Sequence, residues 1–406
     1  MNKKKIINDP LYGFITIPSE LIFDVIETPE FQRLRRINQM GLADFVYPGA
    51  LHTRFHHALG AMHLMSRTLN NLREKGHEIS NNEYESALLA ILLHDVGHGP
   101  FSHSLEEIIM PGISHEQLSL AIMEVLNDRF SQRLSQAIEM FTGSYPRPFF
   151  NQLIASQLDV DRLDYLNRDS FFTGVSEGTI GAERIIKLFD LVDDEIVVEE
   201  KGIYSVENFL NARRLMYWQV YLHKTGLAAD KMLVKIMQRA RALRHAGGMP
   251  NINEVRLGRY FSKLEEDYST AHYTNKLAAF CGLDDHDVWS AIKEWQHADD
   301  QVLSKLCTML INRRLFKIKL SSREIPDKSL IIEQLSKNLP MNIKELEFFY
   351  DEGSISNSAY IRTGQKIKMI RKSGQVIDIE EATDLPNINA MSQVVSKNYF
   401  CWANIV

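Results

Sequence analysis

The 406-residue chain has little cysteine and no long apolar run. Its cysteines, Cys281, Cys307 and Cys401, are odd in number and far apart, which argues against a disulfide framework and a cysteine-rich zinc site. No apolar run approaches the roughly 18 residues that span a membrane. The lysines near the N-terminus are not followed by the apolar segment of a secretory signal. We therefore expect a cytoplasmic protein that does not enter a membrane.

The chain also lacks an excess of positive charge. It has 46 lysines and arginines against 52 aspartates and glutamates, a net charge of -6. A dedicated nucleic-acid binder would carry a basic surface, so nucleic acid is disfavoured as a partner. A small anionic ligand needs only a local basic pocket and stays compatible with this composition.

Helical periodicity dominates the first 310 residues. One helix is predicted to be capped by Asn82, with Glu85 reaching back, and to end near His94 and Asp95, because two glycines and a proline follow by residue 100. Further helices are predicted over 54–71, 149–168 and 206–243, with a hairpin over 195–205 that turns near Lys201 and Gly202. Beyond Ser321 the pattern predicts a small α+β appendage. The expected protein is mainly α, with domains at 1–320 and 321–406.

A cluster of histidines and acids closes the predicted helix. Residues 94–115 contain His94, Asp95, His98, His103, Glu106 and His115. Mixed imidazole and carboxylate ligands suit divalent iron, manganese, nickel or zinc better than calcium, and leave positions open for water and substrate. A lone buried histidine such as His63 is more often a core residue. The cluster instead favours a catalytic metal, and Asp161, on an apolar helix face, also needs a partner.

Several segments carry a family resemblance. They are INDPLYGFI (7–15), TPEFQRLRRINQMG (28–41), YPGALHTRFHHALG (47–60), LLHDVGHGPFSH (92–103), SHEQ (114–117), LDVDRLDYLNRD (158–169), YLHKTG (221–226) and RRLFK (313–317). In order and approximate spacing the chain resembles the HD-domain deoxynucleoside triphosphate triphosphohydrolases, in particular bacterial members without a SAM domain. The resemblance covers residues 5–320.

The resemblance implies a site and a reaction. One divalent ion, with manganese, iron, nickel, zinc and magnesium all open, would be held by His57, His94, Asp95 and Asp161. Family members attack the α-phosphorus of a deoxynucleoside triphosphate and release deoxynucleoside and triphosphate. The implied substrate contacts are Gln39, Arg54, Arg162, Tyr165, Asp169, Arg213 and Tyr221. His103, oriented by Glu106, is our candidate acid, with His98 and His115 as phosphate ligands.

Specificity and regulation are less fixed by the resemblance. Tyr221 could exclude the 2′-hydroxyl of a ribose by its bulk. Tyr217 and Leu222 stand where the mammalian member of the family has a histidine and a glutamine, so the base preference stays open. The expected activator-nucleotide residues are Lys5, Asn8, Glu27, Gln32, Arg35, Arg184, Arg313 and Lys317. Glutamates at 199 and 200 stand where the mammalian protein is basic, which would repel an activator's phosphates.

The resemblance further implies a homo-oligomer, a dimer or tetramer, with residues 5–35 and 313–317 near the subunit contacts. Two other functions stay open. One is an HD phosphohydrolase or phosphodiesterase for another phosphorylated nucleotide, which would keep the metal site and change only the base and sugar pocket. The other is a non-catalytic nucleotide sensor, which the complete set of metal-ligand candidates disfavours.

Overall fold

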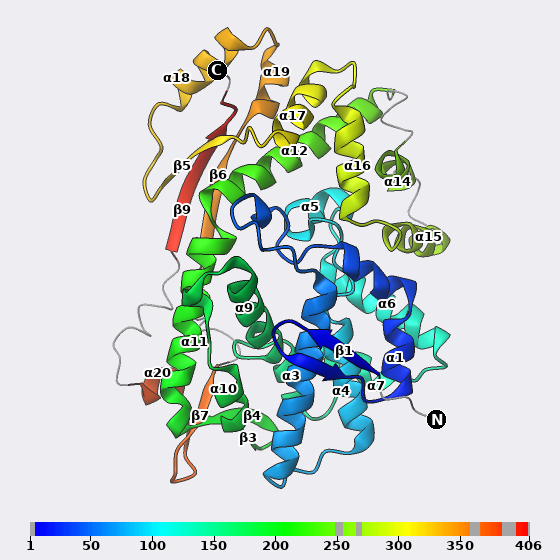
Figure 1. Ribbon diagram of the computed structural model, residues 1–406, viewed down its shortest axis with the longest axis vertical. Coiled ribbons are helices and arrows are strands. Elements are labelled where there is room, and N and C mark those ends of the chain that lie inside the picture. The colour runs from blue at the N-terminus through cyan, green and yellow to red at the C-terminus, as the bar shows by residue number, and fades with distance from the viewer. Residues whose placement is uncertain (1–4, 248–254, 265–269, 358–365, 384–394, 405–406) are drawn as a thin grey trace.

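The computed structural model describes residues 5–247, 255–264, 270–357, 366–383 and 395–404. The first helices are α1 (Glu20–Ile26), α2 (Pro29–Gln32), α3 (Arg54–Glu74), α4 (Asn81–Leu93), α5 (Ser102–Ile109), α6 (His115–Arg129), α7 (Ser135–Thr142), α8 (Phe149–Ile154), α9 (Val160–Thr173) and α10 (Ala182–Leu188). The later ones are α11 (Ile203–Met216), α12 (Lys224–His245), α14 (Arg256–Leu264), α15 (Thr270–Phe280), α16 (Asp285–Trp295), α17 (Gln301–Ile311), α18 (Lys328–Asn338), α19 (Ile343–Leu346) and α20 (Ile379–Ala382). Figure 1 shows α3, α4, α7 and α10 in its lower half. The mainly α fold is confirmed.

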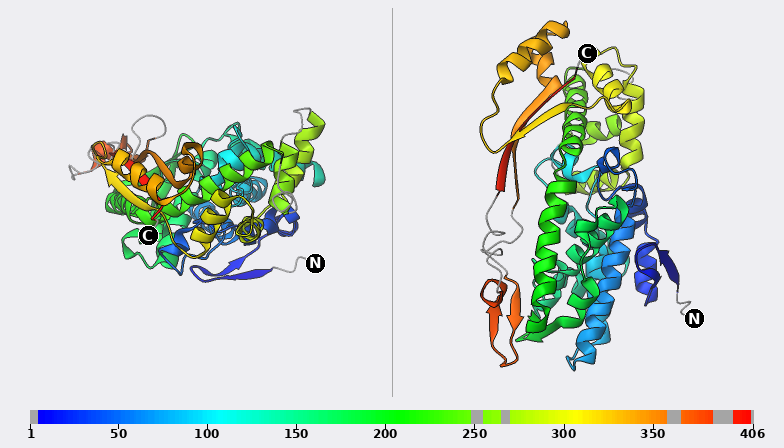
Figure 2. Two further views of the ribbon diagram at one scale, coloured as in Figure 1. Left: turned by 90° about the horizontal axis from the view of Figure 1, so that it is seen from above. Right: turned by 60° about the vertical axis from the view of Figure 1, so that its left-hand side comes forward.

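Three small sheets complete the described structure. Strands β1 (Ile6–Asp9) and β2 (Gly13–Thr16) form an N-terminal hairpin. A four-stranded sheet has the order β3 (Phe189–Val192), β4 (Glu195–Glu199), β7 (Lys368–Ile370), β8 (Val376–Asp378). A three-stranded sheet has the order β5 (Lys317–Ser321), β9 (Val395–Trp402), β6 (Tyr350–Asn357), and Figure 2 shows it alongside α12. The segment after residue 321 thus meets the preceding part of the chain twice, through β9 on β5 and through β7 on β4.

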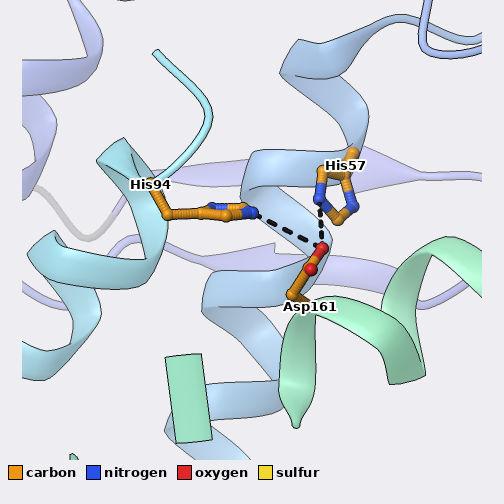
Figure 3. Close-up of side chains that lie close together, drawn as sticks. All are labelled: His57, His94 and Asp161. Atoms are coloured by element: carbon orange, nitrogen blue, oxygen red, sulfur yellow. Dashed lines mark ion pairs between the residues drawn. The ribbon is translucent and has the colours of Figure 1, made fainter. Parts of the chain in front are cut away.

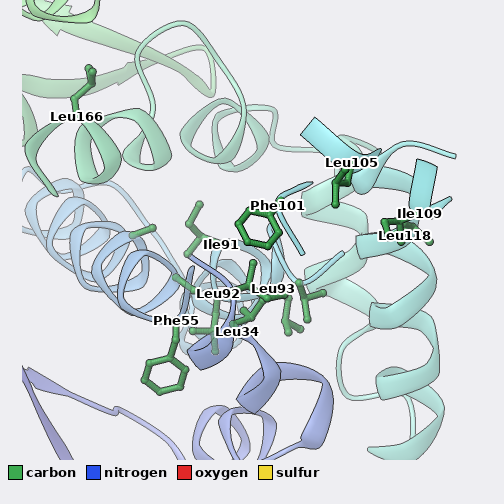
Figure 4. Packing of buried hydrophobic residues seen from close by; sticks show 14 of the residues in the cluster. Leu34, Phe55, Ile91, Leu92, Leu93, Phe101, Leu105, Ile109, Leu118 and Leu166 are labelled. Atoms are coloured by element: carbon green, nitrogen blue, oxygen red, sulfur yellow. The ribbon is translucent and has the colours of Figure 1, made fainter. Parts of the chain in front are cut away.

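The core lies where α3, α4 and α9 pack together. Helix α4 is apolar on every side from Ala87 to Leu93, and all of these residues are buried. Figure 4 shows the end of this helix packed among side chains from separate elements, including Leu34, Phe55 and Phe101. The helix therefore delivers His94 and Asp95 to the edge of the core.

Four local predictions are wrong in detail. Helix α4 is capped by Ser80 in a capping box with Glu83, not by Asn82. The helix predicted over 149–168 is divided into α8 and α9, and the one over 206–243 is interrupted by a π-helical turn at Tyr217–Tyr221. The hairpin turns at Asp193 and Asp194, which have positive φ, and not at Lys201. None of the described helices is long and apolar enough to cross a membrane.

Candidate metal centre

Three helix ends bring two imidazoles and a carboxylate together. His57 lies in the first turn of α3, His94 caps the C-terminus of α4, and Asp161 lies in the first turn of α9. One ligand atom from each lies within 4.8 Å of the others, and Figure 3 shows the two rings directed at the carboxylate. The distances from Asp161 Oδ1 are 3.1 Å to His57 Nε2 and 3.4 Å to His94 Nε2.

Asp95 adds a fourth potential ligand beside this group. Its Oδ1 is 3.3 Å from His94 Nε2, and its Oδ2 is 3.8 Å from His57 Nε2. Arg54 Nη1 donates a hydrogen bond of 2.6 Å to Asp95 Oδ2 and so restrains the carboxylate. The structure thus gathers all four predicted ligands, although Asp95 lies outside the tightest group of three.

The donor set fits a divalent cation. His57 Nδ1 is 2.8 Å from Asp164 Oδ2, and His94 Nδ1 is 2.7 Å from the carbonyl of Ile91, so each ring has an acceptor for its Nδ1 proton. Both Nε2 atoms are buried and make no hydrogen bond within the described structure. Both Nε2 atoms face the Asp161 carboxylate, and each Nδ1 is held from behind, which is the arrangement of imidazole metal ligands with an oriented outer shell.

The electrostatics agree with this fit. Burial lowers the pKa of His57, but the carboxylates of Asp161 and Asp164 outweigh burial and raise that pKa to about 10. Burial would raise the pKa of Asp161, yet His57 and His94 bring it below its usual range. These carboxylates favour a proton on the imidazole when no ion is bound, and a divalent ion can take the place of that proton.

The remaining acid–base candidates lie on one side of the centre. The rings of His98 and His115 stack with centroids 4.0 Å apart. Glu106 Oε1 accepts the backbone N–H of His115 at 2.7 Å and is 3.2 Å from its Nδ1. Glu106 therefore orients His115, a contact that sequence reasoning had not anticipated. His103 lies on α5, and its side chain is outside the described residues.

A cavity of about 460 Å³ opens from the centre. Most predicted substrate contacts lie in its wall, namely Gln39, Arg54, Arg162, Tyr165, Asp169 and Tyr221. Tyr221 donates its hydroxyl to Asp169 Oδ2 at 2.7 Å, and His52 Nε2 is 2.7 Å from the other oxygen of that carboxylate. Arg213 is buried behind this wall and is not among the described lining residues.

Sequence reasoning did not single out several residues that shape the site. Asp159 caps α9 and accepts from the backbone N–H of Arg162 at 2.7 Å and from its Nη1 at 2.5 Å, which fixes that guanidinium. Asp164 holds His57 from behind the centre. The spacing from Asp161 to Asp164 and from Asp164 to Arg168, one helical turn each, was the available signal.

The predicted activator residues do not converge on one site within the chain. Lys5, Asn8, Glu27, Gln32 and Arg35 lie on and around β1 and α1. Arg184 is on α10, near the carbonyl of Lys201, and Arg313 bonds the carbonyl of Phe45 just before β5 and Lys317. Figure 1 places α1, α10 and β5 in three separate regions. An activator site built from these residues therefore stays a prediction.

Comparison with known proteins agrees with this geometry. The HD-domain model matches residues 54–169, and the HD-associated-region model matches 180–247. A crystal structure of a phosphohydrolase from Bacteroides thetaiotaomicron is 45% identical, covers 99% of this chain and 100% of its own, and superposes with a TM-score of 0.92. The protein YwfO of Bacillus subtilis is 34% identical over 78% of this chain and 72% of its own.

A further relative is the deoxynucleoside triphosphate triphosphohydrolase SAMHD1 of Bos taurus. It is 29% identical over a region that covers 58% of this chain and 47% of the bovine protein. Fold and site together define a metal-dependent phosphohydrolase. The chain belongs to the HD-domain family, in the group related to the deoxynucleoside triphosphate triphosphohydrolases. The family resemblance drawn from the sequence is confirmed.

Proposed function

We propose that the protein hydrolyses a deoxynucleoside triphosphate to deoxynucleoside and inorganic triphosphate. One divalent ion would be held by His57, His94, Asp95 and Asp161. The observation that carries this proposal is the cavity, because two of these acids, two arginines and several tyrosines line it together. The name of the bovine relative points to the same reaction.

The cationic end of the cavity suits a long phosphate chain. Arg54 is buried, bonded to Asp95 and to Ser102 Oγ at 3.0 Å, and Arg162 is held by Asp159. A triphosphate carries about four negative charges, which these guanidiniums can meet with charge-assisted hydrogen bonds. The Nε atoms of both arginines are buried without a partner in the described structure. A shorter phosphate would leave such donors unpaired, at about 1–3 kcal/mol each.

The chemistry that a divalent ion supplies at such a site is activation of water and polarisation of a phosphoryl oxygen. The protein must then give a proton to the departing 5′ oxygen. We assign this step to His103, which lies on α5 beside the cavity residues Ser102 and Ser104. His98 and His115 would contact the phosphates, with Glu106 orienting His115.

The other end of the cavity suits a sugar and a base. The Tyr221 ring lines the cavity, and its hydroxyl is fixed on Asp169, so the ring cannot move away without losing that bond. A fixed ring can exclude a 2′-hydroxyl by bulk. Gln39 lines the same cavity with a buried Oε1 that lacks a described partner, and Tyr217 and Leu222 complete this wall.

The test is a comparison of dGTP, GTP and dGDP with metal-defined protein, with phosphorus NMR identifying the released anion. We expect triphosphate from dGTP. Release of pyrophosphate or orthophosphate would place attack away from the α-phosphorus and refute the proposal. If manganese, iron, magnesium, nickel and zinc all fail with every dNTP, another phosphorylated nucleotide or a sensing role becomes the better assignment.

We also propose a homo-oligomer, with residues 5–35 and 313–317 near the subunit contacts. Ile6 and Phe14 on the β1–β2 hairpin are 60% and 74% exposed, and burial of such side chains in a subunit contact would stabilise it. Light scattering should show a dimer or tetramer with dGTP or GTP present. A monomer with and without these nucleotides would refute the oligomer.

A further inference from the structure

A continuous network of buried charged side chains begins at His57 Nδ1. His57 Nδ1 is 2.8 Å from Asp164 Oδ2. The two carboxylate oxygens of Asp164 accept from Arg168 Nε at 2.9 Å and from Arg168 Nη2 at 3.0 Å. Arg168 Nη1 then donates to Asp9 Oδ2 at 2.9 Å. His57, Asp164 and Arg168 are fully buried, and Asp9 is 4% exposed.

The far end of this network lies on the N-terminal hairpin. Asp9 is the last residue of β1, and its Oδ1 accepts the backbone N–H groups of Leu11 at 2.9 Å and Tyr12 at 3.0 Å. Arg168 Cζ lies over the Tyr12 ring, 5.5 Å from the ring centroid. The tip of the hairpin therefore caps Arg168 with a carboxylate and an aromatic ring.

The packing around the charges is specific. Gly60 lies on α3 close to the turn that carries His57. A Cβ at this position would come within 2.0 Å of Asp164 Oδ1 and 2.2 Å of Arg168 Nη2. Glycine lowers helix stability relative to alanine. Its presence in the middle of α3 is explained by the room that the Asp164–Arg168 pair requires.

The charged groups of this network stabilise one another's ionised forms. Burial would raise the pKa of Asp164, but Arg168 and the hydrogen bond with His57 bring that pKa below its usual range. Asp164 is therefore ionised and accepts the Nδ1 proton of His57. If Arg168 lost Asp9, an arginine that is now matched by two carboxylates would keep only one, and its orientation would loosen. Removing one partner from a buried ionic network is costly.

We propose that Asp9, Arg168 and Asp164 are positioning residues for the metal centre, so that docking of the β1–β2 hairpin sets the affinity for the divalent ion. The inference rests on the proposed metal role of His57. Outer-shell partners of this kind fix the tautomer and ring orientation of a histidine ligand, and their loss lowers metal affinity about 10- to 100-fold. Because coupling is reciprocal, a bound ion also strengthens docking of the hairpin.

The first test is the variant Asp9→Asn in the full chain. The asparagine oxygen can still accept from Leu11 and Tyr12, so the local turn is kept while the ion pair with Arg168 is lost. Metal-free protein is titrated with Co²⁺, and visible absorption reports both affinity and ligand geometry. We expect the Kd for Co²⁺ to rise at least 10-fold and the absorption spectrum to change.

Asp300→Asn is the matched control. Asp300 also accepts a local backbone N–H, from Leu303 at 2.8 Å, and pairs with an arginine, Arg239, at 2.6 Å. It lies at the start of α17, outside the network. The control should lower the Tm while the Kd for Co²⁺ stays within twofold. A folded Asp9→Asn protein with unchanged Kd, or an equal loss in the control, would overturn the inference.

A second measurement needs no variant. Hydrogen exchange of the Leu11 and Tyr12 amides is followed in the wild-type chain with and without Co²⁺, and we expect slower exchange with the ion. Equal exchange rates overturn the coupling even if Asp9→Asn fails to fold. Failure of the proposed metal centre is distinguishable, because the spectrum in the first titration of the wild-type chain would then stay that of free Co²⁺.

Discussion

The histidines around the cavity fall into two electrostatic groups. Carboxylates raise the pKa values of His57 and His94 against the effect of burial. Burial and the neighbouring Arg54 instead bring the pKa of His98 well below its ordinary value. His98 is therefore neutral at pH 7. In the proposed reaction it would offer a phosphate a neutral donor and not a positive charge, and the proton for the departing 5′ oxygen would come from another group.

His103→Ala tests the residue to which we assign that proton. We expect the variant to retain its divalent ion, because His103 is outside the ligand group, and to lose turnover by about 100-fold or more. Elemental analysis and a steady-state assay measure the two quantities on the same preparation. Asp95→Ala is the comparison and should lose the ion itself. Activity near wild type, or loss of metal from His103→Ala, would refute the assignment.

Single residues also show where sequence reasoning ends. The position of His94 and Asp95 at the end of a buried helix was predictable, because apolar periodicity runs up to them and a glycine-rich segment follows. The partner of Arg168 was not, because Asp9 lies 159 positions away and only the folded hairpin brings the two together. The pairing of Glu106 with His115 was missed for a related reason. Helix spacing favoured His103 as the partner, while the turn before α6 brings the His115 backbone N–H to Glu106.

At the scale of elements, the start of α16 joins two walls of the cavity. The Asp285 carboxylate accepts the backbone N–H of Asn38 at 2.8 Å and that of Phe101 at 3.2 Å. Phe101 has a left-handed backbone with φ of 48°, which is unfavourable for a bulky side chain. Asp285 therefore stabilises a strained residue that lines the cavity.

This buried acid predicts a pH dependence of stability. Burial raises the pKa of Asp285 to about 7, although two backbone hydrogen bonds oppose the rise. An unfolded chain leaves this pKa at about 3.9. The folded state binds more protons between these values, so the contribution is full below about pH 4 and is lost as pH rises through 7. Between pH 4 and pH 7 the wild-type chain should lose about 1–4 kcal/mol more stability than Asp285→Asn.

Urea unfolding of both proteins at pH 4, 5.5 and 7 measures this difference. Asparagine retains one acceptor oxygen, so the variant should also lose about 1 kcal/mol at every pH from the second backbone bond. That constant offset is separable from the slope. Parallel curves for the two proteins would show that Asp285 does not titrate in this range.

The π-helical turn at Tyr217–Tyr221 is the second element with a functional consequence. It separates α11 from α12 and places Tyr217, Val220 and Tyr221 in the cavity wall. Single π-turns inside helices are frequent at functional sites. We expect Tyr221→Ala to raise kcat/KM for GTP relative to dGTP by about 10-fold, because the bulk facing the ribose is removed.

Tyr221→Phe is the matched control for that change. It keeps the ring and loses only the hydroxyl that bonds Asp169, so discrimination between GTP and dGTP should persist. If phenylalanine relaxes discrimination as much as alanine does, the hydroxyl and its bond to Asp169, and not the bulk of the ring, distinguish the sugars.

For the whole molecule, the mainly helical class followed from periodicity, whereas breaks between helices did not. The chain divides at residues 155–159 without a glycine or proline, and the apolar spacing continues across the break. The π-turn continues the helix direction and leaves the hydrophobic pattern intact. The pairing of β4 with β7 joins residues about 170 positions apart, which no local pattern encodes. Division into domains at residue 320 therefore stays a prediction.

The predicted metal ligands lie on three separate helices, so a bound ion would join these helices and raise the stability of the fold. The ligands come from α3, from the end of α4 and from α9, which are the helices that form the core. An ion that binds only the folded chain stabilises it by about 2.7 kcal/mol at 100 times its Kd. Chelation should lower the Tm by a few degrees, and adding Mn²⁺ should restore it. Asp161→Ala, measured by calorimetry in the same two conditions, should show no response, because it lacks the oxygen that both imidazoles face. An equal response of wild type and variant would mean that the stabilising ion binds elsewhere.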